Sequence, residues 1–323
     1  MRPCTVIQLF CSSASLQSAM PVSFSYRFLR ARHAFARTLL PLANVASGEM
    51  SSANHNVRLF SQDACEHEEP KTDFFMLHNG DKLAYKRTHG SNLPGVIFLP
   101  GFLSNMTGEK AKILERYCKI YDHPYIRFDY RACGESSGKL DAMTLHEWLD
   151  DVLTVVDTFT NPGEPQILVG SSMGGGLMMH VALKRPERVF GLVGVAAAID
   201  RWTDLEKNLS PEHRALLDAD KAVIGPWGDF PIRRAFLDSL SSLSQSVYTN
   251  QTIPIRCAVR LLHGVKDDVI SYSDSSQIMN KLESSDVQVL ISKSADHRFS
   301  KPQDLQMLVN CVDQLVKQYE SPL

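Results

Sequence analysis

One short turn limits the fold of this chain more than any other segment. A run of Gln, Ile, Leu and Val at 166–169 leads directly into Gly-Ser-Ser-Met-Gly at 170–174, and a helical pattern follows until Pro186. A Gly-x-Ser-x-Gly pentapeptide between a buried strand and a helix forms a sharp turn that lifts its central serine clear of the sheet. We therefore expect Ser172 to be a nucleophile. Ser171 is the local rival, but it does not occupy the central position.

Short apolar runs rich in β-branched residues recur along the chain, and turn residues bound each of them. Beyond 166–169 they lie at 96–99, 125–128, 192–195, 259–262 and 287–291. Continuous apolar runs of this length are typical of strands that are buried on both faces. Runs at 74–77 and 83–87, on either side of an Asn-Gly-Asp turn, predict a hairpin ahead of them.

Helical patterns alternate with these runs. Thr144 and Glu147 form a capping box before an apolar stripe that ends at Phe159. A second helix is expected at 173–184, after the serine turn, and a third from an apolar stripe at 305–316. A leading hairpin followed by alternating strand and helix predicts an α/β-hydrolase fold, in which helices cover both faces of a mostly parallel sheet.

The interval 201–252 interrupts this alternation, because it contains no strand pattern. Ser210 precedes a proline in what resembles a helix start. A second apolar stripe follows, made of Ile232, Phe236, Leu240 and Leu243. Long excursions in compact domains are commonly lids or binding elements. We therefore predict a helical cap, inserted before the strand at 259–262, with an ordinary surface excursion as the alternative.

A serine hydroxyl is a poor nucleophile unless a base, itself oriented by an acid, removes its proton. Asp267 follows the strand at 259–262 and His297 follows the last predicted strand, which is the order of acid and base in α/β-hydrolases. We expect His297 to take the proton of Ser172 and Asp267 to orient the imidazole. Asp268 is the rival acid, but the spacing from the His-Gly turn favours Asp267.

Four other polar residues near these motifs receive structural interpretations. His263 lies in the turn before the acid, and His180 lies on the helix after the serine, where packing explains it. We expect Asp296 to have a local turn or cap role. Asp129, in the turn after 125–128, is expected to be a structural anchor rather than the catalytic acid.

Acyl transfer also needs two donors for the negatively charged oxygen of the intermediate. The first is the backbone N–H of the residue after the nucleophile, Met173. The second is expected from the loop after 96–99, where Phe102 is the candidate. That loop lacks the His-Gly-Gly-Gly form of many lipases, so the choice of Phe102 depends on its position alone.

The first sixty residues differ from the rest of the chain. They contain six arginines and one acid, Glu49, whereas the whole chain carries a net charge of −2. Arginine-rich, serine-rich and acid-poor composition is typical of a mitochondrial transit peptide. We predict such a peptide at 1–60, a mature start near Ser61 and a hydrolase domain at 61–323 in the mitochondrial matrix. A disordered tail is the alternative interpretation of this leader.

Composition argues against several functions. A nearly neutral chain is not expected to bind nucleic acid broadly, and no apolar run reaches the length of a membrane span. The seven cysteines are scattered without a Cys-x-x-Cys pair, so neither a disulfide framework nor a zinc site is indicated. Walker and Gly-x-Gly-x-x-Gly patterns are absent as well. We expect no metal or other cofactor.

Five segments resemble one family of α/β-hydrolases. They are Ile-Phe-Leu-Pro-Gly-Phe-Leu-Ser at 97–104, Arg-Phe-Asp-Tyr at 127–130, 165–175 around the serine, Arg-Leu-Leu-His-Gly-Val-Lys-Asp-Asp-Val at 260–269 and Ala-Asp-His-Arg at 295–298. Together they resemble the mitochondrial palmitoyl-protein thioesterases, also described as acyl-glucuronide esterases. The resemblance covers roughly 70–320, is weakest across the cap, and assigns the family's nucleophile, acid and base to Ser172, Asp267 and His297.

The resemblance implies substrates that composition and spacing do not reveal. They are S-acylated proteins, from which fatty acyl groups are removed, and small acyl esters such as acyl glucuronides. The apolar stripe of the cap would then line an acyl channel or, equally, pack in the core, and Arg131 and Arg233 are candidates for binding a glucuronate. A general carboxylesterase or lipase is the alternative, followed by a non-catalytic binding protein of the same fold.

Overall fold

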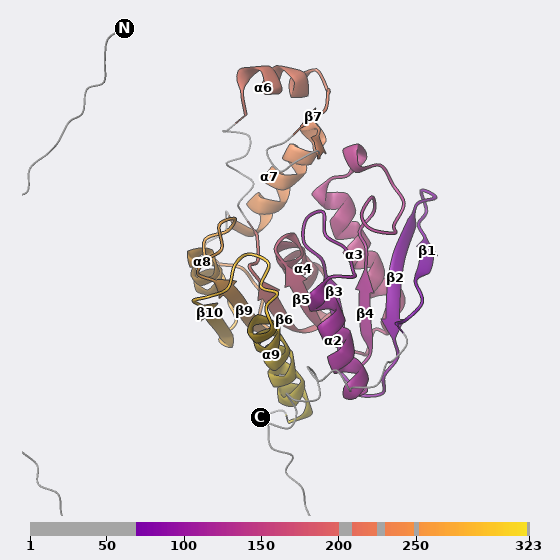
Figure 1. Ribbon diagram of the computed structural model, residues 1–323, viewed down its shortest axis with the longest axis vertical. Coiled ribbons are helices and arrows are strands. Elements are labelled where there is room, and N and C mark those ends of the chain that lie inside the picture. The colour runs from indigo at the N-terminus through magenta and orange to yellow at the C-terminus, as the bar shows by residue number, and fades with distance from the viewer. Residues whose placement is uncertain (1–68, 200–208, 225–229, 249–251, 322–323) are drawn as a thin grey trace, which may run out of the picture. The chain divides into compact units, whose positions relative to one another are not determined.

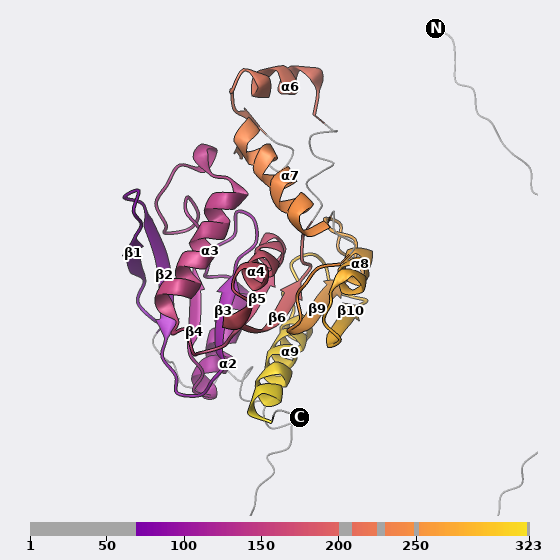
Figure 2. The same cartoon turned by 180° about the vertical axis from the view of Figure 1, so that it is seen from behind.

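The computed structural model describes residues 69–199, 209–224, 230–248 and 252–321. The predicted transit peptide, its cleavage site near Ser61 and part of the predicted cap lie outside these residues. The described chain forms an eight-stranded sheet with helices packed against it (Figures 1 and 2). Its strands are β1 (Asp73–Met76), β2 (Lys82–Thr88), β3 (Gly95–Leu99), β4 (Tyr125–Phe128), β5 (Gln166–Ser171), β6 (Val189–Val195), β9 (Ala258–Gly264) and β10 (Val287–Ser292).

The strands follow the order β1-β2-β4-β3-β5-β6-β9-β10 across the sheet. β1 and β2 form the expected antiparallel hairpin, and β2 pairs antiparallel with β4. Every pairing from β4 through to β10 is parallel. The prediction of a mostly parallel sheet is therefore confirmed. Seven of the eight predicted apolar runs lie within its strands, and the run at 74–77 extends one residue beyond β1.

Helices cover both faces of this sheet. They are α2 (Glu109–Ile120), α3 (Leu145–Phe159), α4 (Met173–Lys184), α8 (Ser273–Lys281) and α9 (Pro302–Glu320). Helices α6 (Pro211–Asp218) and α7 (Arg234–Tyr248) belong to the segment between β6 and β9, where α6 lies away from the sheet (Figure 1). Short 3-10 turns are η1 (Leu140–Ala142) and η2 (Pro186–Arg188). Successive residues of β3 point to opposite faces. Ile97 joins a core cluster with α3, α4 and α7, whereas Phe98 joins a second cluster with α2 and α9.

Local sequence explains where two helices begin. The Thr144 hydroxyl accepts a hydrogen bond from the His146 backbone N–H, and the Glu147 carboxylate accepts one from the Thr144 N–H, so the predicted capping box forms at α3. Ser210 caps α6 by accepting from the His213 N–H at 3.1 Å. These bonds satisfy N–H groups that have no acceptor within the helix.

The segment between β6 and β9 contains α6 and α7, but also two strands that were not expected. Two-residue strands β7 (Val223–Ile224) and β8 (Pro231–Ile232) pair antiparallel. The prediction that 201–252 contains no strand is therefore wrong. Two residues are too few to show an alternating pattern, so this pairing leaves no signal in the sequence.

The apolar stripe expected in this segment is buried. Ile232 on β8 and Phe236, Leu240 and Leu243 on α7 all belong to the cluster that contains Trp148. The Phe236 ring meets the Trp148 and Phe230 rings edge to face, with centroids 6.1 and 5.1 Å apart. The structure thus supports packing in the core for this stripe.

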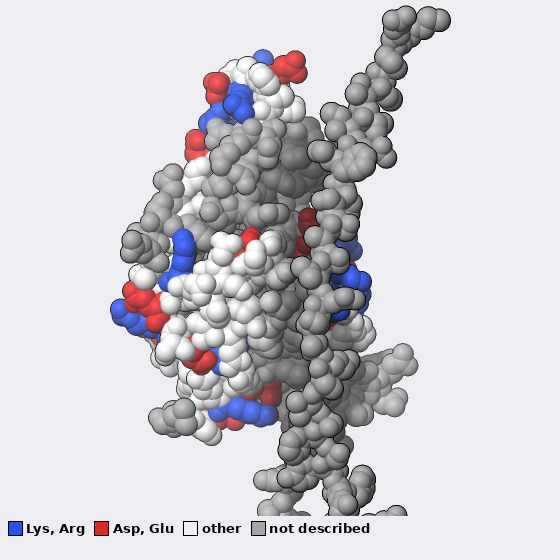
Figure 3. All heavy atoms as spheres, turned by 90° about the vertical axis from the view of Figure 1, so that its left-hand side faces the viewer, with Lys and Arg blue, Asp and Glu red and all other residues white. Residues whose placement is uncertain are grey.

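Surface charge is mixed on the side of α8 and β10. Figure 3 shows that uncharged side chains occupy much of this face, with Lys and Arg lying among Asp and Glu at its margins and on α6. Within the described ranges, no helix is both long and apolar enough to cross a membrane.

Candidate active site

Ser172 occupies a sharp turn between β5 and α4. Its backbone has φ +52°, a value that non-glycine residues rarely adopt. The turn depends on the glycines beside it: a Cβ atom on Gly170 would lie 2.4 Å from the Gly174 carbonyl oxygen, and one on Gly174 would lie 2.3 Å from the Leu99 carbonyl oxygen. The two glycines of the pentapeptide are thus required by close backbone contacts.

Backbone hydrogen bonds hold this strained serine in place. The Ser172 N–H donates to the Val195 carbonyl at 2.8 Å, and the Ser172 carbonyl accepts from the Gly175 N–H at 2.9 Å and the Ala198 N–H at 3.0 Å. Met173 is the first residue of α4, and the first N–H groups of a helix have no acceptor within it. The turn therefore presents a fixed hydroxyl beside helix N–H groups.

His297 and Asp267 complete a chain of hydrogen bonds from this hydroxyl. The Ser172 Oγ lies 3.2 Å from His297 Nε2, and His297 Nδ1 lies 2.8 Å from Asp267 Oδ2. Because Nδ1 faces a carboxylate, it carries the ring proton, which leaves Nε2 to accept from the serine. Three residues that are far apart in the sequence are thus brought together in the predicted order.

Asp267 is held as a carboxylate. Its side chain is fully buried, which by itself raises the pKa, but hydrogen bonds from His263, His297 and the Ile270 N–H outweigh burial. The pKa of Asp267 is consequently well below its usual range. Its second oxygen accepts from the Val269 and Ile270 N–H groups at 2.9 and 2.8 Å, so both oxygens are fixed.

The contact of Asp267 with His263 was not expected from the sequence. His263 Nε2 lies 3.1 Å from Asp267 Oδ2, and His263 Nδ1 lies 2.8 Å from the Ser275 hydroxyl. His263 was interpreted as a structural residue of the turn. The position of His263, four residues before the acid, was the one sequence feature that could have indicated this contact. No sequence feature indicated that Ser275 on α8 contacts His263.

The loop expected to supply the second oxyanion donor passes beside the serine, whereas the rival acid is exposed. A Cβ atom on Gly101 would lie 3.5 Å from the Ser172 Cβ, so the loop after β3 passes beside the serine. Phe102 follows in that loop, and its ring packs against Trp148 and Phe230. Asp268, the rival acid, is exposed.

The two aspartates expected to have structural roles accept backbone hydrogen bonds. Asp296 accepts from the Arg298 and Phe299 N–H groups at 3.1 and 3.2 Å, which fixes the turn around His297. Asp129 is buried and accepts from the Met106 and Glu135 N–H groups at 2.6 and 2.8 Å. Both contacts are those of a turn residue and an anchor.

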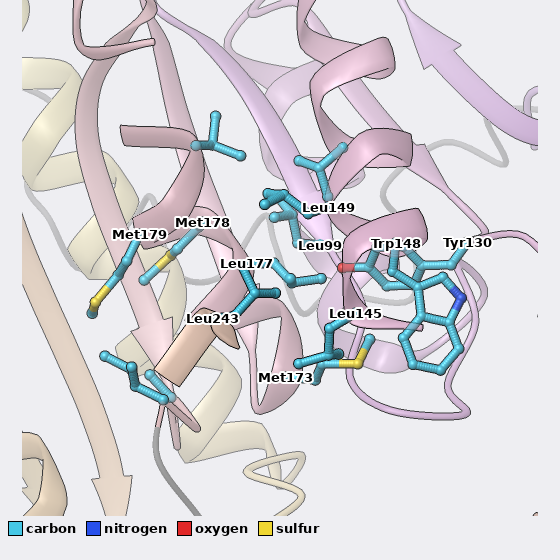
Figure 4. Packing of buried hydrophobic residues seen from close by; sticks show 14 of the residues in the cluster. Leu99, Tyr130, Leu145, Trp148, Leu149, Met173, Leu177, Met178, Met179 and Leu243 are labelled. Atoms are coloured by element: carbon cyan, nitrogen blue, oxygen red, sulfur yellow. The ribbon is translucent and has the colours of Figure 1, made fainter. Parts of the chain in front are cut away.

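A small pocket lies next to Met173. Its volume is about 20 Å³, room for roughly one water molecule. Its lining comes from α3, α4, α7 and the segment after β6 and consists of Leu145, Met173, Gly176, Leu177, His180, Ala198, Ile199, Leu243 and Ser244. Figure 4 shows four of these side chains, Leu145, Met173, Leu177 and Leu243, gathered at one point.

His180 contributes the imidazole of this pocket. Burial, aided by the charges of Lys184 and His146, lowers the pKa of His180 to about 4, so its ring is neutral at pH 7. The expectation that His180 packs in the interior agrees with its place on the buried face of α4.

Both arginines considered for a substrate carboxylate are already paired. Arg131 Nε lies 2.6 Å from the buried carboxylate of Asp151, and its Nη2 donates to the Glu147 carbonyl at 2.6 Å. Arg233 Nη2 lies 2.9 Å from Asp141 Oδ2. Within the described part of the chain, no group of three or more His, Cys, Asp or Glu residues is placed to hold a metal ion.

The sheet, the strained serine and its two hydrogen-bonded partners define an α/β hydrolase. A family model described as "alpha/beta hydrolase fold" matches residues 94–252. Palmitoyl-protein thioesterase ABHD10, mitochondrial, from Bos taurus is 39% identical to this chain over 257 residues, which are 78% of this chain and 82% of the relative.

Solved structures show the same similarity. Alpha/beta hydrolase domain-containing protein 10 from mouse matches with a TM-score of 0.69 and 37% identity, over 77% of this chain and 99% of that one. A putative hydrolase from Agrobacterium vitis S4 matches with a TM-score of 0.69 and 28% identity, over 76% and 99%.

The chain therefore belongs to the ABHD10 family of α/β hydrolases. The predicted fold, the hydrolase class and the family resemblance are confirmed. The mitochondrial localisation is confirmed through the relatives, which are named as mitochondrial proteins.

Proposed function

We propose that this chain hydrolyses acyl thioesters through an acyl-enzyme on Ser172. The observation that carries the proposal is the continuous hydrogen-bonded chain from the Ser172 hydroxyl through His297 to Asp267, with separations of 3.2 and 2.8 Å. A serine in a strained turn, a base within reach and a buried acid are the parts that nucleophilic acyl transfer requires.

The first half-reaction uses these groups in sequence. His297 Nε2 takes the hydroxyl proton while Ser172 Oγ attacks the acyl carbonyl carbon, and Asp267 stabilises the imidazolium that forms. The carbon–sulfur bond then breaks, and His297 returns the proton to the leaving thiolate. In the second half-reaction His297 takes a proton from water, whose oxygen attacks the ester carbonyl carbon. The bond from that carbon to Ser172 Oγ then breaks, and His297 returns its proton to Oγ as the acid leaves.

Two backbone N–H groups would stabilise the oxyanion of each intermediate. Met173 supplies the first, at the N-terminus of α4, where the helix dipole favours negative charge. Phe102 supplies the second, because its loop passes beside the serine. Its packed ring supports this role by fixing the backbone to which the N–H belongs.

The relatives support S-acylated proteins as the substrate class. The Bos taurus and human relatives are named palmitoyl-protein thioesterases. A thioester has a good leaving group, and the same acyl-enzyme would process small activated esters, acyl glucuronides included. The guanidinium groups of Arg131 and Arg233 already bind Asp151 and Asp141, so neither arginine is assigned to a glucuronate carboxylate.

We also propose that residues 1–60 are a transit peptide and that the mature enzyme works in the mitochondrial matrix. The net charge of +5 on this segment supports entry along a negative-inside potential. Sequencing the N-terminus of the native protein tests the leader, and a terminus upstream of residue 30 contradicts it.

We further propose that the segment from about 201 to 252 is a cap over the acyl site.

A fluorophosphonate probe tests the nucleophile. We expect wild-type protein to be labelled and Ser172→Ala to lose labelling. Ser171→Ala is the matched control, because it removes the neighbouring hydroxyl and should leave labelling intact. Labelling of Ser172→Ala at the wild-type rate would refute the assignment by showing that another serine is the nucleophile. A wild-type protein that the probe does not label would favour the non-catalytic alternative.

Substrate preference separates a thioesterase from a general carboxylesterase. The purified mature enzyme is given an S-palmitoyl-cysteine peptide and, in parallel, a simple aryl ester, with Ser172→Ala as the blank for both. We expect higher kcat/KM for the thioester. A strong preference for the aryl ester favours the carboxylesterase.

A further inference from the structure

The acid of the site bonds two imidazoles through one oxygen. Asp267 Oδ2 lies 2.8 Å from His297 Nδ1 and 3.1 Å from His263 Nε2. The side chains of Asp267 and His263 are both fully buried, so neither can exchange its partner for water. The mechanism proposed above uses only His297 and leaves His263 without a function.

The contacts of His263 determine which nitrogen carries its proton. Nε2 faces two acceptors, Asp267 Oδ2 and the Ile270 carbonyl at 3.1 Å, and must therefore be the donor. Nδ1 is then an acceptor, and it lies 2.8 Å from the hydroxyl of Ser275, which donates to it. Ser275 is itself buried and belongs to α8, so a separate element fixes this tautomer.

We propose that His263 is a positioning residue for catalysis, held by Ser275, that sets the orientation and the acceptor strength of Asp267 toward His297. The proposal rests on the triad proposed above. With His263 in place, Oδ2 shares its lone pairs between two N–H donors, and Oδ1 is held by two backbone N–H groups. All four donors stabilise the carboxylate, which therefore cannot rotate or take the proton of His297.

Removing the N–H donor of His263 should shift the pH dependence of activity in one direction. Oδ2 then serves His297 alone and becomes a stronger acceptor for its Nδ1–H. The imidazolium form of His297 is stabilised further, so the pH at which the base becomes active rises. A role of His263 in packing alone has no such effect, since it changes only the amount of folded enzyme.

Other charged residues lie next to Asp267 and His297 in the sequence, or on helices α8 and α2, and must be kept constant. They are Lys266 and Asp268 in the turn after β9, Asp274 on α8, Asp296 and Arg298 beside His297, and Lys110 from α2. Lys110 donates to the Arg298 carbonyl, and Asp296 bonds backbone N–H groups. Among the described residues, none of these side chains hydrogen-bonds to His263 or Asp267, and the variants below change none of them.

The experiment compares the pH dependence of kcat/KM in four variants of the full-length enzyme. His263→Ala removes the donor, and His263→Gln keeps an N–H that can reach Asp267. Ser275→Ala removes the hydroxyl that fixes the tautomer. Ser273→Ala is the matched control, because it removes an α8 hydroxyl that bonds Ser271 instead. Burst titration with a fluorophosphonate counts active sites in each preparation, so rates are expressed per competent serine.

We expect kcat of His263→Ala to fall about 10- to 100-fold, by analogy with outer-shell residues that orient the ligands of a metal, with KM nearly unchanged. The acid limb of its kcat/KM profile should move upward by about half a pH unit or more. Ser275→Ala should shift the limb in the same direction by less, His263→Gln should restore it, and Ser273→Ala should match the wild type.

Acid limbs that coincide in all four variants, with rates per active site unchanged, would overturn the proposal. If His263→Ala does not fold, the comparison of Ser275→Ala with Ser273→Ala decides. Coinciding acid limbs of their kcat/KM profiles refute the proposal, and an acid limb of Ser275→Ala at higher pH supports it. A wild-type enzyme that the probe does not label contradicts the proposed function instead, so the two failures are distinguishable.

Discussion

Two buried aspartates at the same edge of the sheet show how similar positions acquire different chemistry. Asp129 follows β4 and Asp267 follows β9, and the parallel arrangement places the carboxyl ends of both strands at one edge. Each carboxylate accepts two backbone N–H groups. Asp267 alone receives two imidazole donors in addition.

The pKa values of the two groups move in opposite directions. Burial raises the pKa of Asp129 despite its two backbone donors. At Asp267 the imidazole and backbone donors outweigh burial, and its pKa falls well below the usual range. Two backbone N–H donors are thus enough for Asp129 to anchor a loop. Asp267, which must remain charged beside the proposed catalytic base, has imidazole N–H donors as well.

The largest effect on catalysis should come from replacing Asp267, which accepts hydrogen bonds from both imidazoles. Asp267→Asn is expected to lower kcat about 10⁴-fold, because an amide group no longer selects the correct tautomer of His297. Steady-state kinetics on protein shown to be folded by circular dichroism measures this. Activity within tenfold of the wild type would show that Asp267 is not the catalytic acid.

Asp129→Asn should instead affect stability. Its amide keeps one acceptor oxygen, so the N–H of Met106 or Glu135 loses a partner, at a cost of about 1–3 kcal/mol. Urea denaturation measures the loss. We expect kcat per folded molecule to stay within about threefold; a collapse of kcat with unchanged stability would reverse the roles of the two aspartates.

The contributions of the two aspartates to stability should change in opposite directions with pH, because folding shifts their pKa values in opposite directions. The pKa of Asp267 is lowered by folding. Its contribution to the free energy of unfolding is therefore present above its pKa in the unfolded chain, near 3.8, and is lost as the pH falls through its pKa in the folded protein. The pKa of Asp129 is raised by folding. Its contribution to the free energy of unfolding is therefore present below its pKa in the unfolded chain and is lost as the pH rises through its pKa in the folded protein. Melting temperatures near pH 3.5 and 7 should therefore show that acid enlarges the destabilisation by Asp129→Asn and reduces that by Asp267→Asn. The same trend in both variants would contradict the comparison.

The smallest effect is expected at the neighbour of the acid. Asp268 is exposed, and its removal leaves every contact of Asp267 in place. Asp268→Asn should change kcat/KM less than about twofold, since an exposed charge is screened by solvent. A loss approaching that of Asp267→Asn would make Asp268 the acid.

Much of this site could be predicted because its parts are adjacent to strand ends. A glycine-flanked serine after β5, an aspartate after β9 and a histidine after β10 are each recognisable locally, and a parallel sheet brings strand ends together. The bond between His263 and Ser275 could not be predicted in this way. It depends on how α8 packs against β9, which no short motif encodes.

Two helices also gave no clear pattern before the structure was known. α2 buries Glu115, which pairs with the buried Arg127 on β4 at 2.7 Å, so its inner face is partly charged. α8 is rich in serine and buries only Ser275 and Ile278. Both helices are stabilised by tertiary contacts that an apolar stripe does not reveal.

The position of β10 makes catalysis sensitive to the outermost strand. Among the described strands, β10 is the outermost of the sheet and pairs with β9 alone. The turns that carry Asp267 and His297 are joined by hydrogen bonds from the Val265 and Lys266 N–H groups to the Ser292 and Ala295 carbonyls. Detachment of β10 would remove the contacts of Val287 and Val289 with one core cluster and of Leu290 with the other. It would also displace the turn that carries His297, the proposed base, although the serine turn lies between β5 and α4. On the proposed mechanism, turnover therefore depends on the docking of the last strand as well as on the serine turn.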